Sequence, residues 1–218
     1  MTELLRFGVL GGLLGLDGTA VGQFMVSRPL VAGWLTGWAA GAPGLGIMIG
    51  AILELFLLVS FPTGGARFPE GSTAAVVAVG VAVPFEGSGA LAVSIAMGLV
   101  WGQVGGWSVT VQRRVNSRLV PIDVASRTGS LGRAHLLAIV TDGVRGSVVT
   151  MVGVALGRAS LGVVDARWPV DPSMSAGVLY VGAAVSLGIL LHDLGGFRRR
   201  RVLFVLGLAV GIVGARFL

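Results

Sequence analysis

The chain has 218 residues, of which 54% are hydrophobic and only 12% are charged, whereas soluble domains have about 25% charged residues. This composition excludes an ordinary soluble domain and indicates an integral membrane protein. The chain lacks cysteine and has two isolated histidines, which excludes disulfides and Cys-ligated metals, and we expect neither a metal nor a cofactor.

The first apolar region, residues 4–26, is interrupted by the polar and glycine residues at 15–18 and is followed by Ser27, Arg28 and Pro29. Proline removes a backbone donor and disfavours helix at the residue before it, so both places predict broken helices. Asp17 has two interpretations: it binds a ligand, or it caps a half-helix that begins at Thr19. Glu3 precedes the apolar run, unlike the basic start of a cleavable signal peptide, so we expect the N-terminus to be retained.

Glycine accounts for 37 residues, well above the usual level of about 7%. Two groups repeat at four-residue spacing, which lines one helix face with residues that let another backbone approach: Gly33, Gly37 and Gly41, then Gly98, Gly102 and Gly106. The pattern predicts tight helix packing, with sliding surfaces between moving bundles as the alternative.

The stretch 62–71 is rich in proline and glycine and lies between two short apolar runs, 44–61 and 72–85. We predict a re-entrant helical hairpin with its tip in this stretch. Irregular backbone at membrane depth persists only where it is buried in protein or lines a wet cavity, so the tip is a candidate binding site.

Glu54 stands inside an otherwise apolar run, residues 47–61. A charge at the centre of a membrane helix costs about 2.5–3.5 kcal/mol on insertion scales, so it should face a partner or a polar cavity. Two interpretations remain open: Glu54 binds a substrate, or it forms a structural ion pair with Arg28 or Arg67.

Neutral polar and aromatic side chains surround these acids in the sequence: Gln23, Ser27, Thr36, Ser60 and Thr63, with Trp34, Trp38, Phe61 and Phe68. Carboxylates and amides pair with sugar hydroxyls, and aromatic faces contact the apolar side of a sugar ring, so this combination suits a neutral polyol better than an ion. The tryptophans also fit interfacial anchors. We predict no catalytic residue, because no recognisable catalytic motif occurs. Asp142 and Arg145, three apart, predict an ion pair within the membrane.

The second half contains apolar segments at 89–112, 135–157 and 173–194. Five arginines lie between Arg113 and Arg133, and four more are consecutive at 198–201. Short loops rich in arginine stay in the cytoplasm, so we place the connection 112–134 and the second arginine cluster on the cytoplasmic side, with 158–172 opposite. Without a soluble module, the arginines do not indicate nucleic-acid binding.

These features predict one domain over residues 1–218: an all-α, polytopic transmembrane helical bundle with broken helices and at least one re-entrant helical hairpin.

Residues 16–33 resemble the N-terminal signature of the IIC subunit in the mannose/fructose/sorbose family of bacterial phosphotransferase-system (PTS) sugar permeases. Glu54, the run 62–66 and the Pro69-Glu70 pair are similar to that family's hairpin. Residues 113–137 are similar to its cytoplasmic connection. The resemblance covers nearly the whole chain.

The resemblance implies a multi-pass subunit of the bacterial inner membrane that imports a hexose-type sugar. It implies a IID membrane subunit and soluble IIB and IIA phosphocarriers as partners, with no phosphorylated residue in this chain, and a possible oligomer. Together with the interpretation of the residues above, it leads to a predicted substrate-binding set: Asp17, Gln23, Ser27, Glu54, Pro62, Thr63, Gly64 and Gly65.

The sequence departs from the family pattern at three positions. Gly18 stands where the family usually has a basic residue, Arg67 adds a charge to the hairpin tip, and Glu70 replaces the more usual aspartate. Two alternatives therefore stand beside the permease: a membrane scaffold or sensor that does not transport, and a permease for another small solute.

Overall fold

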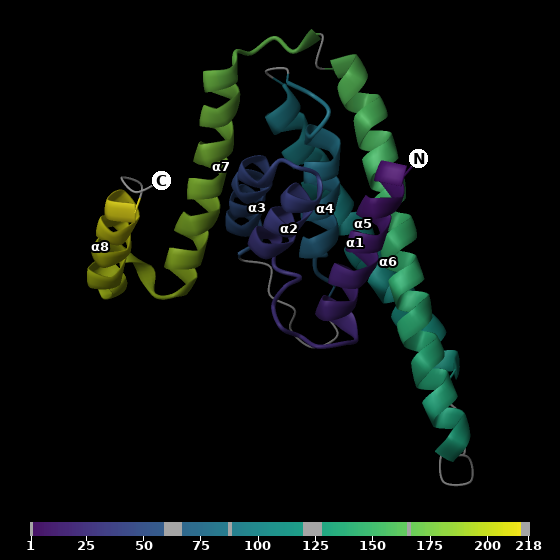
Figure 1. The fold of residues 1–218 in the computed structure, drawn as a ribbon. Coiled ribbons are helices and arrows are strands. Elements are labelled where there is room, and N and C mark those ends of the chain that lie inside the picture. Colours follow the sequence, from purple (N-terminus) through teal and green to yellow (C-terminus); the bar gives the residue numbers. More distant parts are fainter. Residues whose placement is uncertain (1, 59–66, 87–88, 120–127, 165–166, 215–218) are drawn as a thin grey trace.

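The computed structural model describes residues 2–58, 67–86, 89–119, 128–164 and 167–214. These residues form eight helices and no strand (Figure 1), which confirms the predicted all-α class. In chain order the helices are α1 Thr2–Thr19, α2 Pro29–Ala39, α3 Pro43–Leu57, α4 Gly71–Ala82, α5 Ala90–Leu119, α6 Thr128–Val164, α7 Pro172–Asp193 and α8 Gly196–Gly214.

Helices α5 and α6 form the long side of the molecule, and α1 and α4 pack against α6. Helices α2 and α3 lie together and contact α4, while α7 packs against α3 and α8 packs against α7. In Figure 1, α8 lies away from the rest of the bundle. The core is centred on α4, whose residues from Ser72 to Ala82 are all buried.

Three of the described helices are long and apolar enough to cross a membrane: α5 over Ala90–Arg118, α6 over Leu131–Val164, and α7 over Pro172–Asp193. The predicted segments 89–112, 135–157 and 173–194 fall mainly on these helices. Arg158 does not lie in the predicted connection but inside α6, where its guanidinium donates to the Gly80 carbonyl oxygen at 2.8 Å. The end of α5, the start of α6 and the turn after α7 lie toward the same end of the molecule (Figure 1).

The N-terminal helix ends later than the sequence predicts. Helix α1 passes through residues 15–18 without a break and ends at Thr19. The carboxylate of Asp17 is 5% exposed and accepts the backbone N–H groups of Phe24, at 2.7 Å, and Ser27, at 2.9 Å. Asp17 therefore holds the loop after α1, and the half-helix expected from Thr19 does not exist. The predicted break before Pro29 is confirmed, because α2 begins at that proline.

Helices α2 and α3 form a compact helical hairpin that the sequence analysis did not predict. A Cβ on Gly33 would lie 2.6 Å from the Gly46 carbonyl oxygen, and one on Gly37 would lie 2.7 Å from the Gly46 Cα, so the two backbones are in contact. Gly41 does not share this role, because the helix ends before it and its φ of +78° forms the turn. Glycine there avoids the cost of a left-handed side-chain residue.

The second glycine repeat packs as predicted. A Cβ on Gly98 would lie 2.7 Å from the Ala74 carbonyl oxygen, and one on Gly102 would lie 3.1 Å from the Ala74 Cβ. This face of α5 therefore contacts α4 directly. The flanks of the predicted re-entrant hairpin, α3 and α4, are 15 and 12 residues long, shorter than the roughly 20 residues of a spanning helix. Residues 62–66 of its predicted tip lie outside the described residues.

A buried ion network joins the helices at one level. The guanidinium of Arg145 donates to both carboxylate oxygens of Glu70, at 2.8 and 3.1 Å, and to Asp142 at 2.7 Å. The three side chains are only 6–9% exposed. The predicted ion pair between Asp142 and Arg145 is thus confirmed, with Glu70 as a second acid. Hydroxyl groups complete the network, and they belong to Thr19, Thr73 and Ser108.

We predict that Gly46→Ala destabilises the hairpin, because the added methyl group meets backbone atoms of Gly33 and Gly37 that cannot move aside. Overpacking of this kind costs about 1–3 kcal/mol. The measurement is the apparent melting temperature of the purified protein in detergent. Gly44→Ala is the matched control, since a Cβ there meets no atom within 4 Å. Equal melting temperatures for the two variants would contradict the packing.

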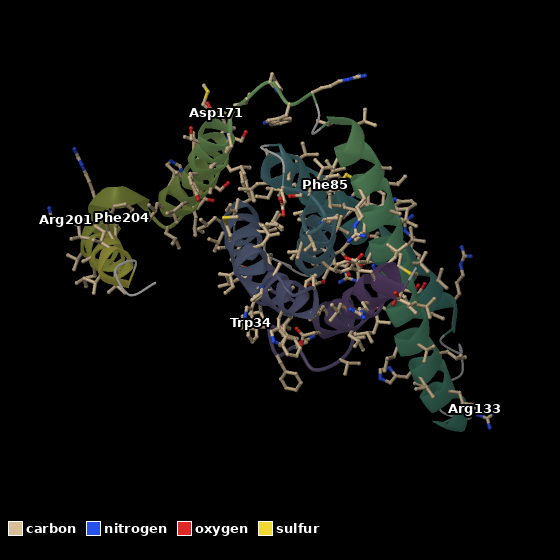
Figure 2. The ribbon with its side chains drawn as sticks, turned by 45° about the horizontal axis from the view of Figure 1, so that its top comes forward. Trp34, Phe85, Arg133, Asp171, Arg201 and Phe204 are labelled. Atoms are coloured by element: carbon tan, nitrogen blue, oxygen red, sulfur yellow. The ribbon has the colours of Figure 1, made fainter. Side chains whose placement is uncertain are left out.

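We also predict that Arg145→Met lowers the stability and yield of the protein, because it leaves the carboxylates of Glu70 and Asp142 buried without a cation. Removing one partner of a buried ion pair costs about 3–5 kcal/mol. Arg133→Met is the control on the same helix, at the exposed end seen in Figure 2. The assay is monodisperse yield and melting temperature, and a variant at position 145 as stable as the control would argue against the network.

Candidate functional site

A cavity of about 460 Å³ lies where α1 and α3 end and α2 and α4 begin, with α5 as a further wall. Its volume falls in the range of about 300–1,000 Å³ typical of small-molecule sites. The polar and charged side chains on its wall are Asp17, Thr19, Gln23, Ser27, Arg28, Glu54, Arg67, Glu70, Ser72, Thr110 and Arg113. The ends of four helices thus produce a polar pocket inside an apolar bundle.

The cavity brings together the four predicted binding residues that the structure describes: Asp17, Gln23, Ser27 and Glu54. The other four predicted residues, at positions 62–65, lie outside the described residues.

Three further residues of the polar and aromatic set do not line this cavity. Thr36 is buried and donates to the Ala32 carbonyl oxygen at 2.7 Å. Trp34 and Trp38 are 45% and 69% exposed, and Figure 2 shows Trp34 at the periphery of the body. Their positions agree better with anchoring at the membrane interface than with contact to a ligand.

Glu54 forms one of the ion pairs that its sequence context allows and also lines the cavity, while substrate binding stays a prediction. Its carboxylate forms an ion pair with Arg28 and accepts the Leu30 backbone N–H at 3.3 Å, at the start of α2. Its side chain is 17% exposed, and both it and Arg28 line the cavity. The helix N-terminus and the guanidinium stabilise the charge, and the side chain forms part of the cavity wall.

The loop after α1 forms one wall and is held in a demanding conformation. Gln23 and Met25 have φ angles of 55° and 65°, the left-handed region, which costs about 1–2 kcal/mol for a residue with a side chain. The two hydrogen bonds to Asp17 described above offset this cost. Asp17 therefore positions Gln23 and Ser27 at the cavity, and backbone strain maintained in this way is typical of binding sites.

Sequence reasoning placed Glu70 in the predicted tip but left it out of the predicted binding set, and the structure shows it on the cavity wall. It occupies the N-cap position of α4, its backbone N–H donates to the Gly102 carbonyl oxygen at 2.8 Å, and its carboxylate connects the cavity wall to Arg145. The signal was present in the Pro69-Glu70 pair immediately before a helix. Its arginine partner, 75 residues later, could not be inferred from spacing.

A second cavity of about 250 Å³ adjoins the first, and Thr19, Val109 and Arg113 line both. Its other polar residues are Gln112, Asn116, His135 and Asp142, from α5 and α6. Arg113 thus lies on the boundary between the two spaces.

The main cavity offers hydrogen-bond acceptors and donors side by side. Glu54 and Asp17 present carboxylate oxygens, Arg28 presents a charged donor, and Ser27 and Thr110 present hydroxyls. Such a wall can exchange water for the hydroxyl groups of a polyhydroxylated solute, because each hydroxyl both donates and accepts.

Comparisons with known proteins identify the family and the fold of the chain. A family described as "PTS system sorbose-specific iic component" matches residues 1–184. No curated protein gives a significant sequence match.

Two solved structures share the fold. One, described as "Structure of membrane protein", is 16% identical with a TM-score of 0.74, over 100% of this chain and 93% of the other. The second, described as "CryoEM Structure of Mannose Transporter ManYZ and Microcin E492 (MceA) complex", is 16% identical with a TM-score of 0.62, over 99% of this chain and 92% of the other. At this identity the likeness shows the fold.

The family match spans most of the chain and confirms the resemblance found in the sequence. It identifies a transport subunit of a multi-subunit system and not a stand-alone enzyme. The chain belongs to the sorbose-specific IIC component family of the phosphotransferase system, and it is a membrane-embedded sugar permease component.

Proposed function

We propose that this subunit carries a hexose-type sugar across the membrane through the main cavity, and that Glu54 is the central binding group. The observation that carries the proposal is a carboxylate held between Arg28 and the N-terminus of α2, on the wall of a polar cavity of about 460 Å³. A hydrogen bond from a sugar hydroxyl to such a charged acceptor contributes about 1.5–3 kcal/mol.

The rest of the proposed binding set follows from position. Gln23 and Ser27 lie on the loop that Asp17 organises, so they present an amide and a hydroxyl to the same space. Asp17 acts mainly by holding this loop. The proposal also includes Pro62, Thr63, Gly64 and Gly65, on the strength of the resemblance between this stretch and the family's hairpin.

The partners in this proposal are a IID membrane subunit and soluble IIB and IIA phosphocarriers, which phosphorylate the sugar at the cytoplasmic face. Membership in a IIC family supports this division of labour. The similarity in fold to a chain of the mannose transporter ManYZ structure also supports it.

We place the chain in the bacterial inner membrane as a multi-pass protein. Three long apolar helices and two arginine-rich connections support this placement. In this orientation the α5–α6 and α7–α8 connections are cytoplasmic.

Replacing Glu54 with glutamine should reduce sugar uptake by roughly 10- to 100-fold, since a neutral amide forms weaker hydrogen bonds with hydroxyls than a carboxylate does. The measurement is uptake of labelled hexoses into proteoliposomes that contain the IIC and IID subunits and the soluble carriers. Glu86→Gln is the control, because Glu86 is exposed and does not line the cavity. Both variants should insert and assemble normally.

If Glu54→Gln takes up sugar with unchanged kinetics, Glu54 does not belong to the binding site. If the unsubstituted complex takes up no hexose, the result favours the scaffold or another solute over a hexose permease.

The proposed orientation can be tested with single cysteines, because the natural chain contains none. Cysteines introduced at Ser117 and Arg198 should react with a membrane-impermeant maleimide from the cytoplasmic side. A cysteine at Ser173 should react only from the opposite side. Labelling is compared in right-side-out and inside-out vesicles, and reaction of Ser173→Cys from the same side as Ser117→Cys would exclude this topology.

A further inference from the structure

We propose that Arg67 and Arg113 form an anion-recognition pair in the main cavity, so that the sugar bound there carries an acidic group, either a carboxylate or a phosphate ester. The inference rests on the proposed function of this cavity as the sugar site. It revises the expectation of a neutral polyol, which was based on carboxylates, amides and aromatic residues and not on the arginines.

The acids on the cavity wall already have partners. Asp17 accepts two backbone N–H groups, Glu54 pairs with Arg28, and Glu70 forms a two-pronged ion pair with Arg145. Each of these carboxylates thus already contacts protein donors, and two of the three, Glu54 and Glu70, pair with an arginine.

The two remaining arginines on the wall differ in this respect. Within the described part of the chain, neither Arg67 nor Arg113 forms an ion pair with an acidic side chain. The Arg113 guanidinium lies 5.9 Å from the centre of the Phe68 ring, and Phe68 follows Arg67 directly in the chain. The aromatic face stabilises the cation and orients it without neutralising it.

The surrounding backbone adds to the positive character. Helix α4, 12 residues long, begins at Gly71 with no side chain capping its N-terminus, and both Gly71 and Ser72 line the cavity. The free N–H groups and the dipole at a helix start favour negative charge. The cavity wall therefore carries two guanidinium groups that no acidic side chain of the described residues pairs, and such groups suit an anionic oxygen group of a ligand.

The excess of arginine in the proposed cytoplasmic connections does not by itself explain the position of Arg113. Arg113 and its neighbours Arg114 and Arg118 lie on the same helix and are all exposed, but of the three only Arg113 lines the cavities. Arg113 lines both cavities, so an acidic group bound there would lie at the boundary between them while the sugar ring reaches Glu54.

The test uses the purified full-length chain in phosphatidylcholine nanodiscs, where no anionic headgroup competes. Affinities for glucose, glucuronate and glucose 6-phosphate are measured by isothermal titration calorimetry. We expect at least one of the two acidic sugars to bind about tenfold or more tightly than glucose, the gain from one charged hydrogen-bonded contact. Preference for glucuronate assigns the pair to a sugar carboxylate, and preference for glucose 6-phosphate assigns it to a phosphorylated product.

Arg67→Gln and Arg113→Gln should each bring the affinity for the acidic sugar down toward that of glucose, whereas the matched control Arg114→Gln should keep the preference. The preference should also weaken with added salt, since screening reduces charge attraction. Equal affinities for glucose and the acidic sugars, or a preference that survives in the Arg67→Gln/Arg113→Gln double variant, would overturn the inference and leave a glucose site intact. Failure of all three sugars to bind would overturn the proposed function as well.

Discussion

The structure depends on a single constraint: an ionised carboxylate inside an apolar bundle must be paired with a cation or with backbone donors. The ion network of Arg145 satisfies this constraint for Glu70 and Asp142 and in doing so joins α1, α4, α5 and α6 at one level. The helices that end beside the network leave the main cavity open next to it. Stability and the proposed transport site therefore share the same polar groups.

Much of the fold could be predicted from the sequence because its signals are local. Length and apolarity indicate the spanning helices, proline fixes the start of α2, and the spacing of Gly98 and Gly102 indicates a packing face. An isolated acid such as Glu54 can also be recognised in the sequence, since every other residue of α3 is apolar. Each of these inferences needs only neighbours within a few turns of helix.

The rest of the fold and of the candidate site depends on contacts between residues that are far apart in the sequence. Glycine at 15 and 18 suggests a helix break, yet α1 continues past both because α6 packs along it. The carboxylate of Asp17 accepts hydrogen bonds from the loop that follows the helix. The α2–α3 hairpin was missed for a similar reason: Gly46 contacts Gly33 across a turn, and no periodicity within α3 alone indicates its partner. Glu70, the third member of the Arg145 network, likewise lies far away in the sequence, at the start of α4.

The α2–α3 hairpin has one consequence for the energetics of movement. Its two backbones meet through glycine, without side-chain rotamers that could rearrange, so the hairpin should shift only as a rigid piece. Arg28 occupies the N-cap position of its first helix and Glu54 lies in its second, so the cation and the anion move together. Displacing a single charge through the membrane potential requires about 2.3 kcal/mol per 100 mV. A hairpin that contains both signs of charge moves without that electrical work.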